Sequence, residues 1–185
     1  MNLSPPPSAP PILEASHLRK CFGSREVLRD VSFSVPAGTI LSVLGRSGTG
    51  KSVLLKCIVG LLPADSGEMF YKGESLKEKS RLSALRQSAS YVFQHNALFD
   101  SATVYENVRL PLQARGTGTR AEWDAQVEEA LERLELKEAA SRYPSELSGG
   151  MQKRLAVARA LVTKPELVFF DEPTAGLDPL RRNAV

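Results

Sequence analysis

The stretch that decides the fold is "GRSGTGKS", which occupies residues 45–52. It satisfies the pattern G-x-x-x-x-G-K-[ST], in which glycines let consecutive backbone N–H groups converge on phosphate oxygens. The apolar run before it, residues 39–45, predicts a strand buried on both faces, and residues 51–62 after it predict a helix. Because strand, loop and helix follow in that order, the pattern is more specific than a plain glycine-rich turn.

Residues around this loop also indicate a metal site and a hydrolytic centre. Lys51 is placed to reach the β and γ phosphates, and Ser52 offers a hydroxyl to Mg²⁺. A second magnesium ligand is expected from an acid at the end of an apolar strand, and Asp171 ends "LVFFD". Glu172 follows in position to orient or deprotonate an attacking water, although two solvated strand-end acids are the alternative. The predicted nucleotide contacts of the loop are Gly45, Arg46, Ser47, Gly48, Thr49, Gly50, Lys51 and Ser52.

A second turn of phosphate-binding type lies much later in the chain, in "SELSGGMQKR" at residues 145–154. Ser148 is placed to cap a helix, because an amphipathic helical pattern follows it. Together with Gly149 and Gly150 it presents a hydroxyl and backbone N–H groups at a helix N-terminus, where anions bind. One small chain therefore carries two candidate phosphate sites.

The rest of the chain predicts alternating helices and strands. Residues 12–22 and 31–35 favour two antiparallel edge strands, the second by clean alternation of apolar residues. Thr119 and Glu122 match a capping box at the start of a helix that extends to about residue 136. Further strands are predicted at residues 68–72, 90–94 and 166–170, with a short polar helix between the first two.

Composition limits the class of protein. With 185 residues, 42% of them hydrophobic, the chain has the length and apolar content of one globular domain. The net charge of +3 is spread thinly, which argues against a nucleic-acid surface. The longest apolar stretch, residues 53–62, is broken by Lys56 and is too short for a membrane span. Cys21 and Cys57 fit reduced packing residues, and the proline-rich residues 1–11 predict a disordered leader.

An ordered set of short motifs resembles the nucleotide-binding subunit of ABC transporters. The set comprises "GRSGTGKS", Phe93-Gln94, "LSGGM" at residues 147–151, "LVFFDEP" at residues 167–173 and "AGLD" at residues 175–178. The resemblance covers residues 12–185 and implies an α/β P-loop NTPase with a RecA-like parallel sheet core. An antiparallel β subdomain and an α-helical signature subdomain are implied with it, as are the cofactors ATP and Mg²⁺ and an ATPase activity.

The resemblance also assigns roles on the P-loop side of the site. By it, Gln94 contacts Mg²⁺ and the attacking water and relays the state of the site to a membrane partner. Phe22 would stack on adenine, where the family usually has tyrosine; core packing is the alternative for a lone aromatic at a strand end.

For the second turn, the resemblance implies a role between two copies of the subunit. Family members pair head to tail, so that Ser148, Gly149 and Gly150 would close on the γ-phosphate held by the partner copy. Asp178 would lie at the same seam. Met151 departs from the glutamine that is usual in the wider superfamily.

Two stretches look like one subgroup, the ATPases of mammalian-cell-entry (MCE) type lipid transport. They are residues 97–112 and residues 143–154, and Met151 fits that subgroup. The expected substrate is then a phospholipid or another hydrophobic molecule. The expected partners are an integral membrane permease, a second copy of the subunit and an MCE-type substrate-binding protein, but no nucleic acid. The expected location is cytoplasmic, on the inner face of a bacterial cell membrane.

Two alternatives stay open at this point. A soluble ABC ATPase of translation or DNA repair would carry a second cassette or a long coiled-coil insertion, and neither is recognisable in the sequence. A non-catalytic fragment is the second, because family members carry a switch histidine beyond the position of Asp178, where this sequence has only "PLRRNAV". On that reading the C-terminal part is missing, and the 185-residue chain alone should be inactive and partly molten.

Overall fold

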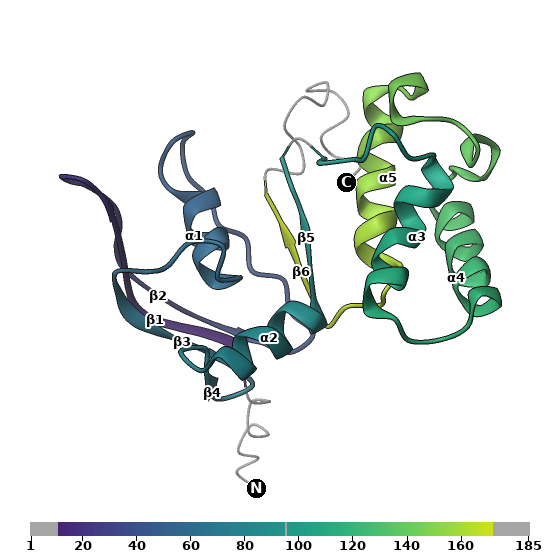
Figure 1. The fold of residues 1–185 in the computed structure, drawn as a ribbon. Helices are drawn as coiled ribbons and strands as arrows, with labels where there is room; N and C mark the ends of the chain where they lie inside the picture. The colour runs from purple at the N-terminus through teal and green to yellow at the C-terminus, as the bar shows by residue number, and fades with distance from the viewer. Residues whose placement is uncertain (1–10, 95, 172–185) are drawn as a thin grey trace, which may run out of the picture. The chain divides into compact units, whose positions relative to one another are not determined.

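The computed structural model describes residues 11–94 and 96–171 (Figure 1). The chain divides into two compact units, Met1–Arg86 and Gln87–Val185. The first strand begins at Pro11, and the rest of the predicted leader lies outside the described residues. Across the described ranges, none of the helices reaches the length and apolar character that a membrane crossing requires.

The first unit contains an antiparallel sheet of four strands. They are β1 (Pro11–Phe22), β2 (Arg25–Pro36), β3 (Ser66–Tyr71) and β4 (Glu74–Ser75), in the order β2-β1-β3-β4. The prediction of two antiparallel strands is confirmed, but β1 is an interior strand because it pairs with both β2 and β3. Only β2 is an edge strand of the two. Leu13, Leu18 and Leu28 are buried, so apolar burial anchors this sheet.

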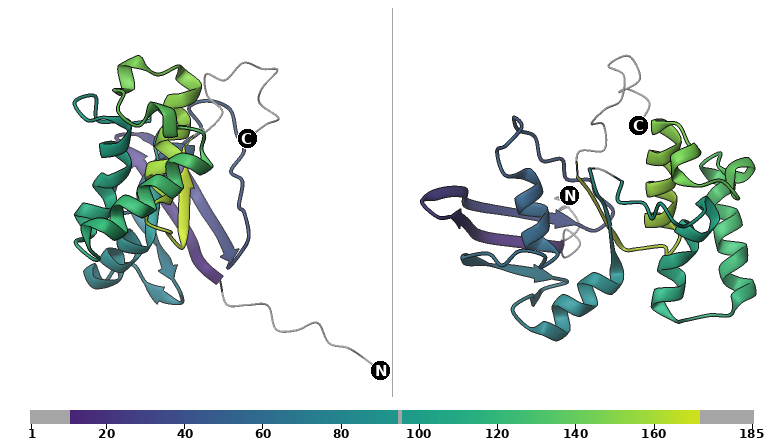
Figure 2. Two further views of the ribbon diagram at one scale, coloured as in Figure 1. Left: turned by 90° about the vertical axis from the view of Figure 1, so that its right-hand side faces the viewer. Right: turned by 45° about the horizontal axis from the view of Figure 1, so that its top comes forward.

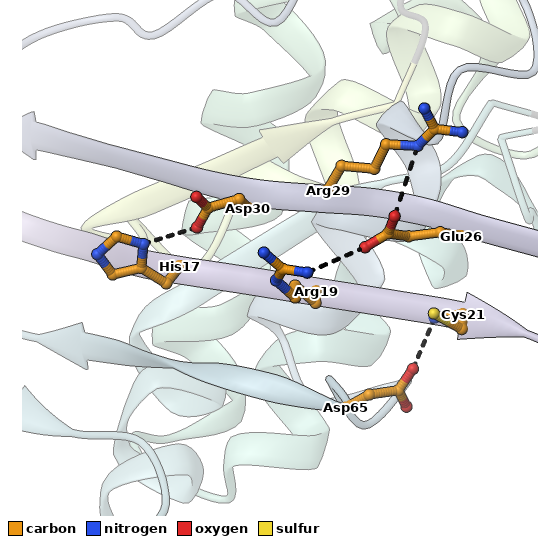
Figure 3. Close-up of polar contacts among 7 residues, drawn as sticks. All are labelled: His17, Arg19, Cys21, Glu26, Arg29, Asp30 and Asp65. Carbon is orange, nitrogen blue, oxygen red and sulfur yellow. Dashed lines mark hydrogen bonds and ion pairs between the residues drawn. The ribbon is translucent and has the colours of Figure 1, made fainter.

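Exposed charged side chains cross between β1 and β2 (Figure 3). The His17 Nδ1 atom lies 2.6 Å from Asp30 Oδ1, and both residues have a positive φ where the strand register shifts. Further along, Oε1 of Glu26 on β2 lies 3.5 Å from Nη1 of Arg19 on β1. Its Oε2 lies 3.7 Å from Nε of Arg29, which is on β2 as well. Exposed pairs of this kind stabilise a fold little, so the sheet depends on its apolar contacts rather than on these charges.

Asp65 fixes the end of β1. Its carboxylate accepts a hydrogen bond from Lys20 Nζ at 2.7 Å. It also accepts one from the backbone N–H of Cys21 at 2.6 Å (Figure 3). The hydrogen bond from Lys20 lowers the pKa of Asp65 most, and the hydrogen bond from Cys21 lowers it further. The two bonds hold the backbone immediately before Phe22, the last residue of the strand.

Two helices, α1 (Lys51–Ile58) and α2 (Lys79–Ser88), complete this part of the chain. The predicted helix over residues 51–62 is confirmed at its start but ends earlier. Gly60 has φ 70°, and a Cβ there would lie 2.7 Å from Leu82. Arg86 donates to the carbonyl oxygens of Val59 and Gly60 at 2.9 and 2.7 Å, which fixes the turn that ends α1.

The predicted buried strand over residues 39–45 is wrong. Residues 39–46 run without regular secondary structure, and Ile40 and Leu44 are 95% and 92% exposed. An apolar run becomes a strand buried on both faces only when neighbouring strands satisfy its backbone. Among the described strands, none pairs with it.

In the second unit, β5 (Ala89–Val92) and β6 (Leu167–Phe170) form a parallel pair. Both strands were predicted, and their parallel order agrees with the parallel core implied by the motifs. The register pairs Val92 with Phe170, so the two strands end level with each other. The residues that follow them therefore emerge at one edge of the pair.

The other regular elements in the described part of the second unit are helices. They are α3 (Val104–Arg115), α4 (Arg120–Arg133) and α5 (Gly149–Leu161), with 3₁₀ turns at Lys137–Ala139 and Pro144–Glu146. Figures 1 and 2 show the three helices side by side, with β5 and β6 along α5. The core between them contains Val104, Val108, Leu112, Val127, Leu131, Leu136, Ala139, Leu147, Leu155, Ala158 and Val162.

Helix α4 begins at the predicted capping box, in which the side chain of Thr119 accepts from the N–H of Glu122. Helix α3 was not predicted, although Thr103 and Glu106 form an equivalent box. Its Pro111 breaks the usual helical pattern, because proline lacks the N–H that a helix interior uses.

Candidate functional site

The loop over residues 45–50 leads directly into α1. Lys51 Nζ donates to the carbonyl oxygens of Gly45 and Arg46 at 3.0 and 3.1 Å, so its charge lies over the loop. Thr49 closes the turn from the other side, donating from Oγ1 to the Arg46 oxygen at 2.8 Å. Arg25 Nη2 reaches the oxygen of Gly48 from β2 at 3.4 Å. The loop is thus shaped by contacts to its carbonyls, while an anion would be bound through its N–H groups.

Two glycines of the loop are required for different reasons. Gly48 has φ 78°, and a Cβ there would meet nothing within 4 Å, so its conformation alone favours glycine. Gly50 has φ 101°, and a Cβ there would also meet Val27 Cγ1 at 2.7 Å. As the N-cap of α1, Gly50 provides no side-chain hydrogen bond to the first turn. A helix start capped in this way suits an anionic ligand.

Phe22, the predicted adenine platform, ends β1 and is 48% exposed. Lys20 Nζ lies over its ring, 5.6 Å from the centroid. A half-exposed ring has a face available for stacking, so the core alternative is less well supported; the adenine contact itself stays a prediction.

The edge where β5 and β6 end holds two of the predicted site residues. Asp171 follows β6 directly and is 5% exposed, and Gln94 lies two residues after β5 and is exposed. Oδ2 of Asp171 accepts a hydrogen bond from the Tyr91 hydroxyl at 3.0 Å. Burial raises the pKa of Tyr91 well above its usual value, and the hydrogen bond to this carboxylate adds to the increase. Tyr91 therefore stays a neutral donor that orients the acid.

Tyr91 was missed by sequence reasoning. The alternation in "SYVFQ" did place it on one face with Phe93, and the two ring centroids lie 4.4 Å apart. Glu172 and Asp178, the predicted base and the predicted seam residue, lie outside the described residues. Ser52 belongs to the first unit whereas Gln94 and Asp171 belong to the second, so their shared magnesium site stays a prediction.

The second turn opens α5 as predicted. Ser148 is the N-cap, and its Oγ accepts from the N–H of Met151 at 3.3 Å. Leu147 before it is buried and anchors the turn, while Gln152 Nε2 donates to the oxygen of Pro144 at 2.9 Å. The turn therefore has a fixed shape built from its own flanking residues.

Gly149 and Gly150 are not needed by this local structure. Both are exposed, neither has a positive φ, and an added Cβ on either would meet nothing within 4 Å. Glycine costs about 1 kcal/mol relative to alanine inside a helix. Two adjacent glycines without a conformational or steric cause in the described fold point to something outside it that approaches the backbone closely.

Comparison with known proteins agrees with these features. A family model described as ABC transporter matches residues 28–175. The methionine import ATP-binding protein MetN of Brucella abortus (strain 2308) is 39% identical, over 95% of this chain and 48% of that protein. The glutamine transport ATP-binding protein GlnQ of Escherichia coli (strain K12) is 40% identical, over 94% of this chain and 73% of that protein. Protein TRIGALACTOSYLDIACYLGLYCEROL 3, chloroplastic, of Arabidopsis thaliana is 41% identical, over 94% of this chain and 53% of that protein.

A solved structure gives the same answer for the fold. MJ0796, described as a dimeric bacterial ABC transporter cassette, superposes with a TM-score of 0.80 at 32% identity, over 90% of this chain and 76% of that one. The chain spans about half the length of the first of the curated relatives. With the P-loop, the strand-end acid and the second glycine turn all in place, the chain belongs to the ABC transporter family and has the fold of its ATP-binding cassette.

Proposed function

We propose that this chain binds Mg-ATP at residues 45–52, and that a longer subunit, in which the chain is extended to the length of its curated relatives, hydrolyses ATP to drive an ABC transporter. The observation that supports it most is the pair Gly149 and Gly150, which the described fold does not require. A nucleotide that is held by a second copy and approaches this turn explains both glycines. The proposal treats the two phosphate-binding turns as halves of one site.

The chemistry follows from the groups present. Lys51 neutralises charge on the β and γ phosphates, and the N–H groups at the start of α1 bind the phosphate oxygens. Mg²⁺ neutralises phosphate charge when bound, and Ser52, Asp171 and Gln94 offer it hydroxyl, carboxylate and amide oxygens, the ligands it prefers. Glu172 is the proposed base, which takes a proton from the attacking water. Phe22 is proposed to stack on the adenine.

The second turn is proposed to act in trans. Ser148 Oγ and the N–H groups of Gly149 and Gly150 would meet the γ-phosphate on the partner copy, with Asp178 at the same seam. Because the turn carries no cation between Ser148 and Met151, the helix N-terminus itself supplies the positive potential. This arrangement agrees with the dimeric state described for MJ0796.

Gly149→Asp separates this role from a structural one. A carboxylate in the first turn of α5 interacts favourably with the helix dipole, by about 0.3–1 kcal/mol, so the melting temperature is expected to stay unchanged or to rise slightly. The same carboxylate repels a γ-phosphate, so ATP hydrolysis by the longer subunit is expected to fall about tenfold or more. Thermal unfolding and phosphate release measure the two effects.

The matched control is Ala121→Asp, which adds one negative charge to the exposed first turn of α4. It is expected to leave hydrolysis within about twofold of the wild type. Equal phosphate release in the Gly149 and Ala121 variants would contradict a γ-phosphate at the second turn.

The transported substrate is proposed to be a phospholipid or another hydrophobic molecule. The resemblance of residues 97–112 and 143–154 to MCE-type ATPases, including Met151, supports it, and so does the glycolipid in the name of the Arabidopsis relative. MetN and GlnQ serve methionine and glutamine, so the cassette itself is common to transporters of very different substrates. An MCE-type substrate-binding protein is part of this proposal.

The proposed location is the cytoplasmic face of a bacterial membrane, with the segment after Gln94 against the permease. Val104 is buried in the core, and Leu98 and Tyr105 pack on it, which leaves Phe99, 54% exposed, as the apolar side chain of this segment that is open to a partner.

In vesicles that hold the subunit with its permease, we expect phospholipid to stimulate ATP hydrolysis and methionine or glutamine to leave it unchanged. The reverse would assign the system to polar substrates.

A further inference from the structure

Three arginines in the described fold each hold a pair of backbone carbonyls. Arg86 holds Val59 and Gly60 in the first unit. In the second unit, Arg115 Nη1 and Nη2 donate to Thr163 and Gln87, both at 2.7 Å. Arg159, on α5, donates from Nη1 to the oxygen of Ala97 and from Nη2 to that of Asn96, both at 2.8 Å. Arg159 differs from the others because the loop it holds follows Gln94.

The backbone that Arg159 holds has an unfavourable conformation. Asn96 and Ala97 are consecutive and have φ values of 59° and 48°. Asparagine tolerates this left-handed region, but alanine seldom adopts it, since its Cβ crowds the following carbonyl. An external contact must therefore keep the loop in this shape, and the guanidinium fork is bonded to both carbonyls that the shape presents.

The surroundings of Arg159 fit such a role. Its Cζ atom lies 5.8 Å from the centroid of the Phe99 ring, and no described carboxylate forms an ion pair with it. Burial lowers the pKa of its guanidinium from an ordinary value so high that the group keeps its charge at neutral pH. The carbonyl oxygens and the aromatic face are thus what compensates a partly buried charge.

A second buried group fixes the loop farther along. Asn107, fully buried on α3, accepts from the N–H of Phe99 at 2.9 Å and donates to the oxygens of Phe99, Ala102 and Thr103, each at 3.0 Å. The segment from Asn96 to Thr103 is therefore held from two helices. The two hydrogen bonds from Arg159 tie its backbone to α5, the helix that begins at the Ser148 turn.

We propose that Arg159 is a positioning residue that couples α5 to the loop after Gln94. A displacement of the Ser148 turn would then move the backbone of Asn96 and Ala97, and with it Gln94 on one side and the exposed Phe99 on the other. This inference rests on the proposed function, in which the turn responds to nucleotide and Gln94 serves the hydrolytic site. The inference adds Arg159 as the side chain through which a movement of the Ser148 turn is transmitted to Gln94.

The first test measures the clamp itself, in the longer subunit. Arg159→Met keeps the apolar stem but removes the fork, and Arg115→Met removes an equivalent clamp that lies away from Gln94. Hydrogen–deuterium exchange at Asn96 and Leu98 is expected to become at least about fivefold faster in Arg159→Met and to stay unchanged in Arg115→Met. Unchanged exchange in Arg159→Met would overturn the proposal without touching the ATPase assignment.

The second test measures the consequence for turnover. Arg159→Met is expected to lower kcat for ATP hydrolysis about tenfold while KM stays within about twofold, because nucleotide binding at the P-loop is intact. Arg159→Lys keeps the charge but not the two-pronged geometry, so it should fall between the wild type and Arg159→Met. Arg115→Met should keep kcat within about twofold of the wild type, although it is expected to lower the melting temperature about as much as Arg159→Met does.

Equal kcat values for the two methionine variants would overturn the coupling role and leave Arg159 as an ordinary structural clamp. Should Arg159→Met not fold, the same comparison is made between Arg159→Lys and Arg115→Lys. A wild-type subunit that neither binds nor hydrolyses ATP would instead refute the proposed function, and the exchange experiment would still report on the clamp.

Discussion

Replacement of Lys51 by alanine is expected to weaken Mg-ATP binding about a hundredfold or more, which corresponds to about 2.7 kcal/mol. The physical reason is the position of its ammonium group, 3.0 and 3.1 Å from the carbonyl oxygens of Gly45 and Arg46 and therefore directly over the loop. A phosphate bound by the loop N–H groups would meet this charge at short range. Titration with a fluorescent ATP analogue measures the loss.

Lys56→Ala provides the control, since Lys56 lies in the last turn of the same helix. It removes one positive charge from α1 but none from the loop, so affinity should stay within about twofold of the wild type. Equal affinity in the Lys51 and Lys56 variants would mean that residues 45–52 do not hold the nucleotide.

The second large effect is expected from Glu172→Gln in the longer subunit. Glutamine keeps the size and the hydrogen bonding of the side chain but cannot take a proton from water. Hydrolysis should fall about a hundredfold or more while ATP binding persists, and the variant should accumulate as an ATP-bound dimer. Phosphate release and size-exclusion chromatography with ATP measure the two outcomes.

Glu166→Gln is the corresponding control, because Glu166 is an exposed acid just before β6. It should hydrolyse ATP at close to the wild-type rate. Wild-type turnover in Glu172→Gln would remove Glu172 from the mechanism.

The sequence predicted best those features that local chemistry determines. The capping residues Thr119 and Ser148 start α4 and α5, because a hydroxyl that satisfies a free N–H is a short-range signal. Apolar alternation likewise predicted β2. Asp171 was found from the end of an apolar run, and the structure places it buried beside Tyr91.

Features that depend on distant partners were predicted less well. Residues 39–45 have the composition of a buried strand, but a strand forms only when a neighbour supplies hydrogen bonds. The interior position of β1 depends on its pairing with β3, which no local pattern specifies. Arg159 had no motif to mark it, because its partners are the carbonyls of Asn96 and Ala97, and any residue has a carbonyl.

The central claim is that one nucleotide lies between the P-loop of one copy and the Ser148 turn of another. Mixed dimers of the longer subunit test it most directly. Both copies carry Glu172→Gln to trap ATP; one also carries Lys51→Ala, the other Gly149→Asp, and each has its own affinity tag. Dimers that carry both tags are isolated, and the ATP they retain after gel filtration is measured.

If the turn acts in trans, a doubly tagged dimer has one intact site, built from the P-loop of the Gly149 variant and the turn of the Lys51 variant. We therefore expect ATP to be retained by these dimers and by neither variant alone. The contrary result is that dimers carrying only Glu172→Gln retain ATP while no mixed dimer does. It would show that the loop and the turn of the same copy serve one site, and it would contradict the account.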